Sequence, residues 1–285
     1  MTQKIIRTLL TLLLIFFPFW GSIFLGKHTP YTEGNSLANF IMVYALTTII
    51  AVGVVLYFTS RFKTSFVQPV VPGIILFLMG CVMLGIAGLL APPDLSIKML
   101  DHPEREHFRY ILLSIGLLFF ALFFLHLFLR DALSLTLAQS RLMIALVVIT
   151  IVEIIWEFYH HYHYPEGLQE WVAEGNSADD FSKHYDNWKV GSIGSIGRIV
   201  IYTLILWLSV KLYKLKRITI WNPIVSVVFC ILGLISSFVM FFYFMFDMEA
   251  PKELGFLIIF FIPGIPFLLM YWIGIALLMK KPAAP

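Results

Sequence analysis

The sequence has little charge, almost no cysteine and no hydrophilic segment large enough to form a soluble domain. Only 13% of its 285 residues are charged, whereas 60% are hydrophobic; soluble domains carry about a quarter charged residues. This shortage of charge excludes an ordinary soluble domain. The net charge of +3, without basic runs that alternate with aromatics, excludes nucleic acid as a partner. Cys81 and Cys230 lie in apolar stretches, which excludes a disulfide framework and a cysteine-type metal motif.

What the sequence does have is apolar stretches long enough to cross a bilayer, which takes about 20 residues each. They predict an all-α protein, a single membrane domain (1–285) formed by a helical bundle. The first stretch fits an uncleaved helix better than a signal peptide, because no small-residue cleavage site follows it. The eight predicted transmembrane helices are 5–25, 38–59, 71–91, 109–130, 142–160, 197–215, 222–246 and 255–279.

The charges predict how these helices are oriented. With eight spans, the side that holds the N-terminus carries 12 of the 20 basic residues and one acid, Asp131. The opposite side, or the half-spans nearest to it, carries 16 of the 17 acids and seven of the eight histidines. Basic residues in short loops stay in the cytoplasm. We therefore predict a multi-pass protein of the bacterial inner (plasma) membrane with both termini in the cytoplasm.

The functional groups gather on the predicted outer side. The longest connection, 160–196, is acidic and rich in histidine, which membrane insertion does not require. Within it, segment 164–178 is typical of a short amphipathic helix that lies at the membrane interface. Its apolar stripe consists of Leu168, Trp171 and Val172.

Two glutamates occupy one face of the fifth predicted span. Glu153, Glu157 and His161 stand at i, i+4 and i+8. Glu153 would lie about 10 Å below the outer boundary, where a carboxylate is costly unless it is paired or neutralised. Arg198, at the start of the sixth span, is the natural counter-charge. We take Glu153, Glu157 and Arg198 as candidate catalytic residues, although a purely structural ion pair is the alternative.

A second pattern predicts a metal site. Glu104-x-x-His107 opens the fourth span and Glu157-x-x-His160 closes the fifth, so both meet at one height on antiparallel helices. Paired Glu-x-x-His elements are typical of carboxylate-bridged metal sites in helical bundles. No strict signature such as H-E-x-x-H occurs, and solvated helix ends are the alternative. The candidate ligands for a divalent metal are Glu104, His107, His160, His161 and His184.

Three further residues at this level are candidates for substrate binding. Arg109 would hold an anionic headgroup, since guanidinium groups bind such anions in a bidentate manner. Trp156 and Asp186 flank the same region, although an interfacial tryptophan also fits the usual aromatic belt.

Residues 101–210 resemble the VanZ-like small membrane proteins, including the related YjdF type. In that pattern an Asp and a His-Phe pair open one span, glutamates close the next, and an Asp with spaced glycines enters a third. Val190 departs from it, since the family has an Asn there. The resemblance implies a role at the cell envelope, and some relatives are linked to glycopeptide resistance. The matching residues are Asp101, His107, Phe108, Tyr110, Glu153, Glu157, Asp186, Gly194 and Gly197.

The predicted function is action on a membrane lipid or a lipid-linked envelope substrate at the outer leaflet. A proton- or ion-coupled transporter is one alternative, because Pro263 and Pro266 break the last span and broken helices line many transport sites. In the sequence no ionisable residue accompanies this break. A non-catalytic subunit that docks a protein partner on the outer side is the other alternative.

Overall fold

The computed structural model describes residues 2–28, 36–62, 96–129, 131, 133–246, 256–262 and 264–279. Within these ranges the chain is all-helical and has no strand. The elements are α1 (Thr2–Gly26), α2 (Leu37–Phe62), the 3₁₀ helix η1 (Ile97–Asp101), α4 (Glu104–Leu129), α5 (Leu137–Tyr162), α6 (Tyr164–Ala173), α7 (Ala178–Tyr185), α8 (Trp188–Lys214), α9 (Trp221–Phe246), α10 (Ile258–Phe261) and α11 (Gly264–Met279).

Four helices in the described part of the chain, α4, α5, α8 and α9, are long and apolar enough to cross a membrane. Three shorter apolar stretches, Thr11–Leu25, Leu37–Thr47 and Gly264–Leu277, lie in α1, α2 and α11. The predicted span 71–91 and Cys81 lie outside the described residues. The eight-span count therefore stays a prediction.

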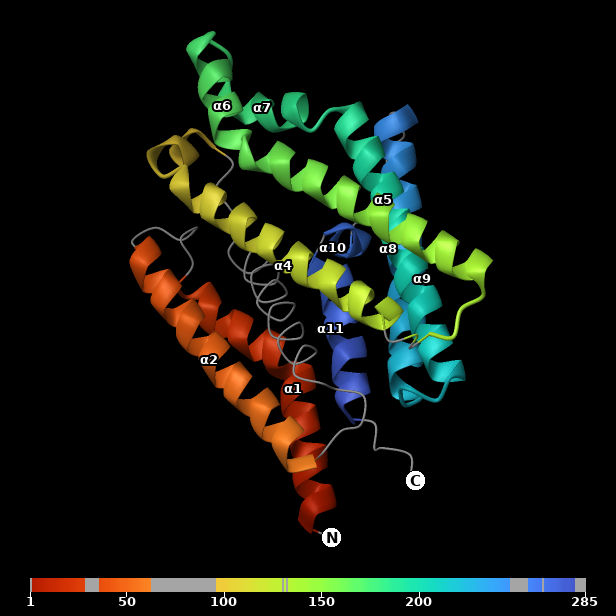
Figure 1. Ribbon diagram of the computed structural model, residues 1–285. Helices are drawn as coiled ribbons and strands as arrows, with labels where there is room; N and C mark the ends of the chain where they lie inside the picture. The colour runs from red at the N-terminus through yellow and green to blue at the C-terminus, as the bar shows by residue number, and fades with distance from the viewer. Residues whose placement is uncertain are drawn as a thin grey trace.

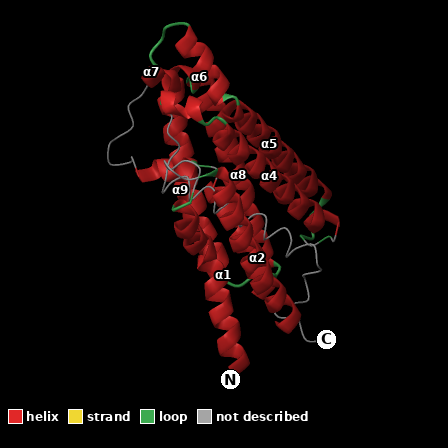
Figure 2. Cartoon of the chain, turned by 90° about the vertical axis from the view of Figure 1, so that its left-hand side faces the viewer, coloured by secondary structure: helices red, strands yellow, loops and turns green. Residues whose placement is uncertain are grey.

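The long helices run alternately up and down (Figure 1). In Figure 1, α1 begins at the lower end and α11 descends toward it. Figures 1 and 2 both show α6 and α7 at the upper end. Helix α8 packs against both α5 and α9. Its first three turns bury the small residues Gly191, Ser192, Gly194, Ser195 and Gly197, which permits close helix approach.

Helix α11 is enclosed by the rest of the protein. Every residue from Gly264 to Leu277 is buried, as expected for a helix that is apolar all round. Its Tyr271 hydroxyl donates to the Leu14 carbonyl of α1. That carbonyl is available because Pro18, four residues later, has no N–H to donate to it. The proline of α1 and the tyrosine of α11 thus form one structural unit.

A second, smaller core lies where α6 and α7 meet η1. It consists of Met99, Tyr164, Leu168 and Phe181, with Trp171 among the partly buried residues around it. The predicted amphipathic helix therefore exists as α6, but it ends at Ala173, and its apolar stripe packs on protein. We call α6 and α7 together the cap.

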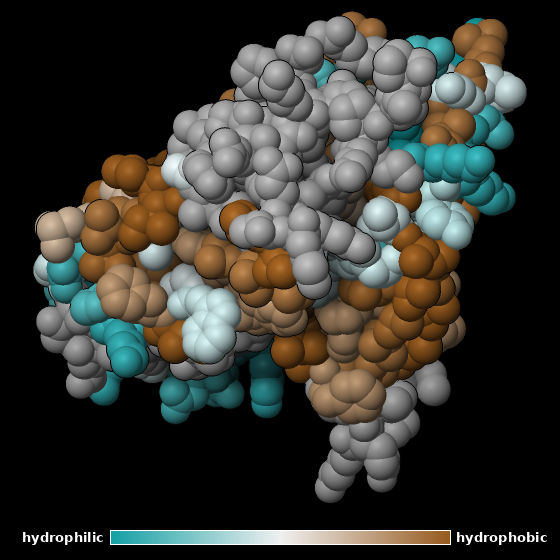
Figure 3. Space-filling model, turned by 90° about the horizontal axis from the view of Figure 1, so that it is seen from below, coloured by the Kyte–Doolittle hydropathy of each residue, from teal (hydrophilic) through white to brown (hydrophobic). Residues whose placement is uncertain are grey.

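The outer surface of the long helices is strongly apolar. Large side chains such as Trp20, Ile49, Leu129 and Phe238 are at least half exposed. Figure 3 shows apolar residues over much of the described surface seen from below, with hydrophilic ones toward its margins. Apolar surface this extensive is typical of a region that faces lipid or another protein.

The packing of α8 against α9 predicts that Gly233 cannot be enlarged. A Cβ at Gly233 would lie 2.3 Å from Cζ of the buried Tyr202 ring. We expect Gly233→Ala to lower the free energy of unfolding by about 1–3 kcal/mol through overpacking, measured by thermal unfolding in detergent. Gly53→Ala is the control, because a Cβ at Gly53 meets no atom of the described residues within 4 Å. Equal stability of the two variants would contradict this packing.

Candidate functional site

Arg198 is the centre of a buried ion-pair group. It lies on α8, is 1% exposed, and its Nη2 donates to Oε2 of Glu157 on α5. Its Nη1 lies 3.5 Å from Oε2 of Glu153, one turn earlier on α5. The structure thus places Arg198 against both glutamates that the sequence offers as its partners. We call Arg198, Glu153 and Glu157 the arginine hub.

The hub depends on a glycine beside the arginine. A Cβ at Gly197 would lie 2.0 Å from Cδ of Glu153. The glutamate side chain therefore occupies space that any larger residue at position 197 would fill. Among the described residues, Oε1 of Glu153 has no hydrogen-bond partner, so its ion pair with Arg198 is the main compensation for burying this carboxylate.

Arg198 also reaches the break in the last predicted span. Its Nε donates to the Phe261 carbonyl at 2.8 Å, and the Tyr202 hydroxyl donates to the Phe260 carbonyl. Both carbonyls belong to the last turn of α10, where a helix has no partners of its own. The sequence-based view that no ionisable residue accompanies this break is therefore wrong. The arginine is simply distant in the sequence, 63 residues before its acceptor.

A second polar cluster lies where α5 ends under the cap. Nε2 of His160 lies 3.1 Å from Oδ1 of Asp186, the residue that caps the end of α7. The His160 ring is stacked between Tyr185, at 4.1 Å between ring centroids, and Trp156, at 5.8 Å. The Tyr185 hydroxyl donates to the His160 carbonyl at 2.8 Å. Asp186 and Tyr185 thus tie α7 to the end of α5.

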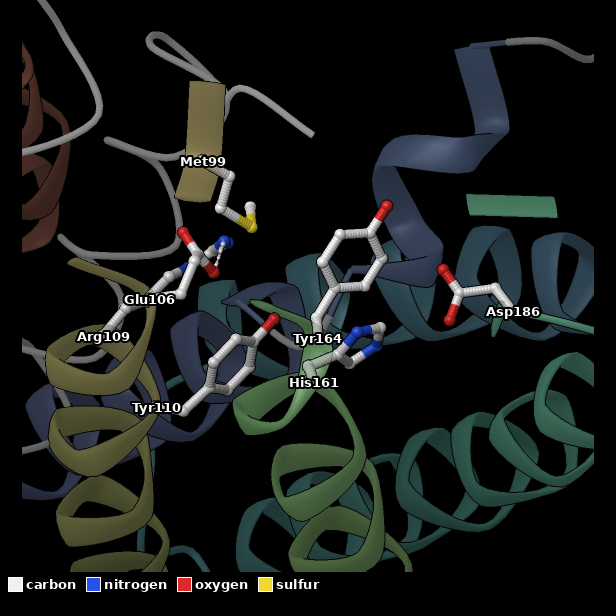
Figure 4. A pocket seen from close by; sticks show the side chains of 7 residues that line it. All are labelled: Met99, Glu106, Arg109, Tyr110, His161, Tyr164 and Asp186. Atoms are coloured by element: carbon white, nitrogen blue, oxygen red, sulfur yellow. Dashed lines mark hydrogen bonds and ion pairs between the residues drawn. The ribbon is translucent and has the colours of Figure 1, made fainter. Parts of the chain in front are cut away.

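Beside this cluster is a pocket of about 150 Å³. Figure 4 shows its lining, in which Glu106 and Arg109 come from α4 and His161 from the end of α5. Nη1 of Arg109 lies 3.5 Å from Oε2 of Glu106, while Oε1 of Glu106 is buried without a hydrogen-bond partner among the described residues. The pocket is lined by Met99, Glu106, Arg109, Tyr110, His161, Tyr164 and Asp186.

Two tyrosines of the cap remain protonated around this pocket. Burial, and then the charge of Asp186, raise the pKa of Tyr164 to about 12 and that of Tyr185 to about 12. Both phenols therefore keep their protons at neutral pH. The Tyr185 phenol donates its hydrogen bond to the His160 carbonyl, whereas the buried Tyr164 hydroxyl has no hydrogen-bond partner among the described residues.

The predicted metal ligands do not all come together. Glu104 is exposed, 3.2 Å from His102, and His184 is exposed and stacked on Trp171. His107 stacks on Tyr162, with its Nε2 2.9 Å from Oε1 of Glu166 on α6. Each of the four residues in the two Glu-x-x-His elements has a different partner. Glu104 lies beside His102 and His107 beside Glu166 of α6. Glu157 lies beside Arg198 and His160 beside Asp186.

One set of three metal-ligand residues does come together in the described part of the chain. His160, His161 and Asp186 each offer a ligand atom, and these atoms all lie within 4.8 Å of one another. Two of the three are among the ligands that the sequence predicts, whereas Asp186 is predicted for substrate binding. The other two residues predicted for substrate binding are Arg109 and Trp156. Arg109 lines the pocket, and Trp156 stacks on His160.

The sequence does not single out Glu106 or Tyr164, and Tyr110 is named only as part of the VanZ-like resemblance. A signal for Glu106 exists, because Glu106 and Arg109 are three residues apart and share one face of α4. Tyr110 stacks on His161 at 5.6 Å, and Tyr164 lies in the small core of the cap. Nothing in the local pattern distinguishes these two tyrosines from the others near the interface.

In the residues that the structure describes, these features define an all-helical protein with four helices of membrane-crossing length and a polar pocket at the end covered by the cap. No protein-family model, curated protein or solved structure matches it. The resemblance of 101–210 to the VanZ-like proteins therefore stays a prediction.

The hub predicts a large loss of stability when its cation alone is removed. Arg198→Met leaves the buried carboxylate of Glu153 and the partly buried one of Glu157 without a counter-charge, which costs about 3–5 kcal/mol. We expect a correspondingly lower unfolding temperature in detergent, with most of the loss recovered when Glu153→Gln and Glu157→Gln are added. Lys214→Met, at an exposed position on the same helix, is the control. Equal unfolding temperatures for Arg198→Met and this control would contradict a stabilising hub.

Proposed function

We propose that the chain is a multi-pass inner-membrane protein with eight spans, both termini in the cytoplasm and its cap on the extracytoplasmic side. Nζ of Lys211, at the end of α8, donates to the Ser134 carbonyl between α4 and α5 at 3.2 Å. These two positions are both predicted to be cytoplasmic. His160 and Asp186, both predicted to be on the outer side, meet at the cap.

At that outer side, we propose, the pocket acts on the polar headgroup of a membrane lipid or a lipid-linked envelope substrate. One observation carries this proposal. A closely spaced set of acidic, basic and phenolic side chains lines a pocket at the ends of α4 and α5, both long and apolar enough to cross a membrane. In a membrane such a pocket lies at headgroup level. A volume of about 150 Å³ suits a small polar group rather than a hydrocarbon chain.

The polar residues of the pocket have different roles in this proposal. Glu106 transfers protons, since a carboxyl group is a common general acid or base. Arg109 attracts the anionic part of the headgroup, and Tyr110 and Tyr164 donate hydrogen bonds to its oxygens. Asp186 holds the cap against α5 through His160.

The arginine hub has a positioning role. Arg198 joins Glu157 to the Phe261 carbonyl, and Glu157 precedes His161 by one helical turn. Glu153, Glu157 and Arg198 therefore set where the end of α5 stands relative to α8. We assign the proton transfer to pocket residues because both hub glutamates already face the guanidinium.

The contacts at the helix break favour this function over the transporter alternative. Carbonyls of α10 accept hydrogen bonds from Arg198 on α8, from Tyr202 one turn later, and from Ser236 on α9, whose Oγ lies 2.7 Å from the Leu257 oxygen. Backbone groups already bonded in this way have little capacity left to coordinate a transported ion.

The test is lipid conversion by the full chain in nanodiscs that contain the envelope lipids of its source bacterium. Mass spectrometry should show one headgroup class consumed by the wild type. In Glu106→Gln we expect the rate to fall by about 10²-fold or more, as for loss of a general acid or base. Glu174→Gln, an exposed change in the cap, should convert at the wild-type rate.

Two results would contradict the proposal. One is a folded wild type that leaves every lipid class unchanged. The other is conversion that proceeds equally in wild type and Glu106→Gln. A protein partner that copurifies with the inactive wild type in a fixed ratio would favour the subunit alternative instead.

A further inference from the structure

The cluster of His160, His161 and Asp186 has the composition of a metal site with an incomplete ligand set. Two imidazoles and one carboxylate suit divalent transition metals, and sites with three protein ligands keep a coordination position open. The three ligand atoms lie within 4.8 Å of one another. Ligands of one tetrahedral zinc ion stand about 3.4 Å apart, from bonds of about 2.1 Å. Small side-chain rotations are enough to close that difference.

We propose that His160, His161 and Asp186 bind one divalent transition-metal ion, with zinc as the best-matched ion. This inference deepens the proposed function and rests on it for the ion's role, but the binding itself is a separate property. It adds Asp186 to the predicted ligands and removes Glu104, His107 and His184, whose partners lie elsewhere.

The surroundings of the three ligands hold them in place. The His160 ring lies between Tyr185 and Trp156, and the His161 ring stacks on Tyr110 with an interplanar angle of 15°. Such contacts restrict the ring orientations, which is what outer-shell residues do for metal ligands. Asp186 stands in the short turn between α7 and α8, and its N–H donates to the Ser182 carbonyl at 2.9 Å. The ligands therefore come from two fixed helix ends.

The pocket supplies the open side of the proposed site. His161 and Asp186 line the pocket together with Glu106, whereas His160 does not. An ion held by all three ligands would thus lie at the pocket wall. Its remaining coordination position would face the cavity, where a water molecule or a headgroup oxygen could bind. Glu106, with one buried oxygen unpartnered among the described residues, adds negative charge on that side.

The alternative is a plain hydrogen bond between His160 and Asp186, which needs neither His161 nor a metal. The two arrangements differ in what His161 does. In the hydrogen-bonded pair His161 only packs on Tyr110, whereas in the metal site it is a ligand. Replacing His161 therefore separates the two, because the His160–Asp186 contact remains in that variant.

The experiment measures zinc binding by the full chain, purified in detergent and freed of metal with a chelator. Competition against a fluorescent zinc chelator should show one ion per wild-type chain. We expect His161→Gln and Asp186→Asn each to weaken binding by at least about tenfold, since even outer-shell losses cost that much. His184→Gln is the matched control, because this cap histidine lies outside the cluster, and it should bind like the wild type.

A second measurement uses the wild type alone, in case a variant does not fold. Bound zinc should protect His160 and His161, but not His184, from acylation of the imidazole, mapped by mass spectrometry. A wild type with a normal unfolding transition that binds no zinc would overturn the inference. The inference would also be overturned if wild type and His161→Gln bound zinc equally well. The same holds if zinc left the extent of acylation unchanged at His160, His161 and His184.

The outcomes also separate this inference from the proposed function. If the wild type binds no zinc but still converts lipid in a Glu106-dependent manner, the metal site is wrong and the function stands. If zinc binds as described but no lipid is converted, the site stands and the lipid function is wrong.

Discussion

A single guanidinium, that of Arg198, holds together elements that nothing else in the described chain joins so directly. It contacts two carboxylates of α5 and a carbonyl at the end of α10, all from a position that is 1% exposed. Arginine suits this role better than lysine because its donors are planar, fixed and always charged. Dispersion and close packing between apolar helices depend little on the rotation of each helix about its axis. A buried, hydrogen-bonded arginine therefore fixes that rotation. The position of the functional groups on α5 follows from it.

Two glycines, one on α8 and one on α9, provide space for the polar side chains around Arg198. Gly197 leaves room for the Glu153 side chain, and Gly233 leaves room for the Tyr202 ring, whose hydroxyl bonds the carbonyl next to the one that Arg198 uses. Each glycine has no side chain at a point where a polar side chain of the neighbouring helix lies. The same small residues that allow helices to pack closely thus also allow buried polar groups to find their partners.

The sequence predicts the local features and misses those that depend on long-range contacts. Composition and apolar length predict an all-helical chain, and the spacing of Glu153 and Glu157 predicts that both lie on one face. Depth in the membrane predicts that they need a cation, which Arg198 supplies. The Phe261 carbonyl could not be predicted, because a backbone group carries no sequence signal and lies 63 residues from the arginine. Nor could the partners of His107 and His160, because they are supplied by Glu166 of α6 and by Asp186 at the end of α7.

The arginine hub and the histidine cluster occupy consecutive turns of one helix, which couples them mechanically. Glu157 and His161 are about 6 Å apart along the axis of α5 at 1.5 Å per residue. Arg198 fixes the first of these turns relative to α8, while Asp186 and Tyr185 fix the second relative to α7. Because α7 leads directly into α8 through Asp186 and Asn187, both attachments end on the same stretch of chain. Contacts therefore form a closed loop through the last turns of α5, the end of α7 and the start of α8. Within this loop, a shift of the arginine hub must displace the histidine cluster, and the reverse.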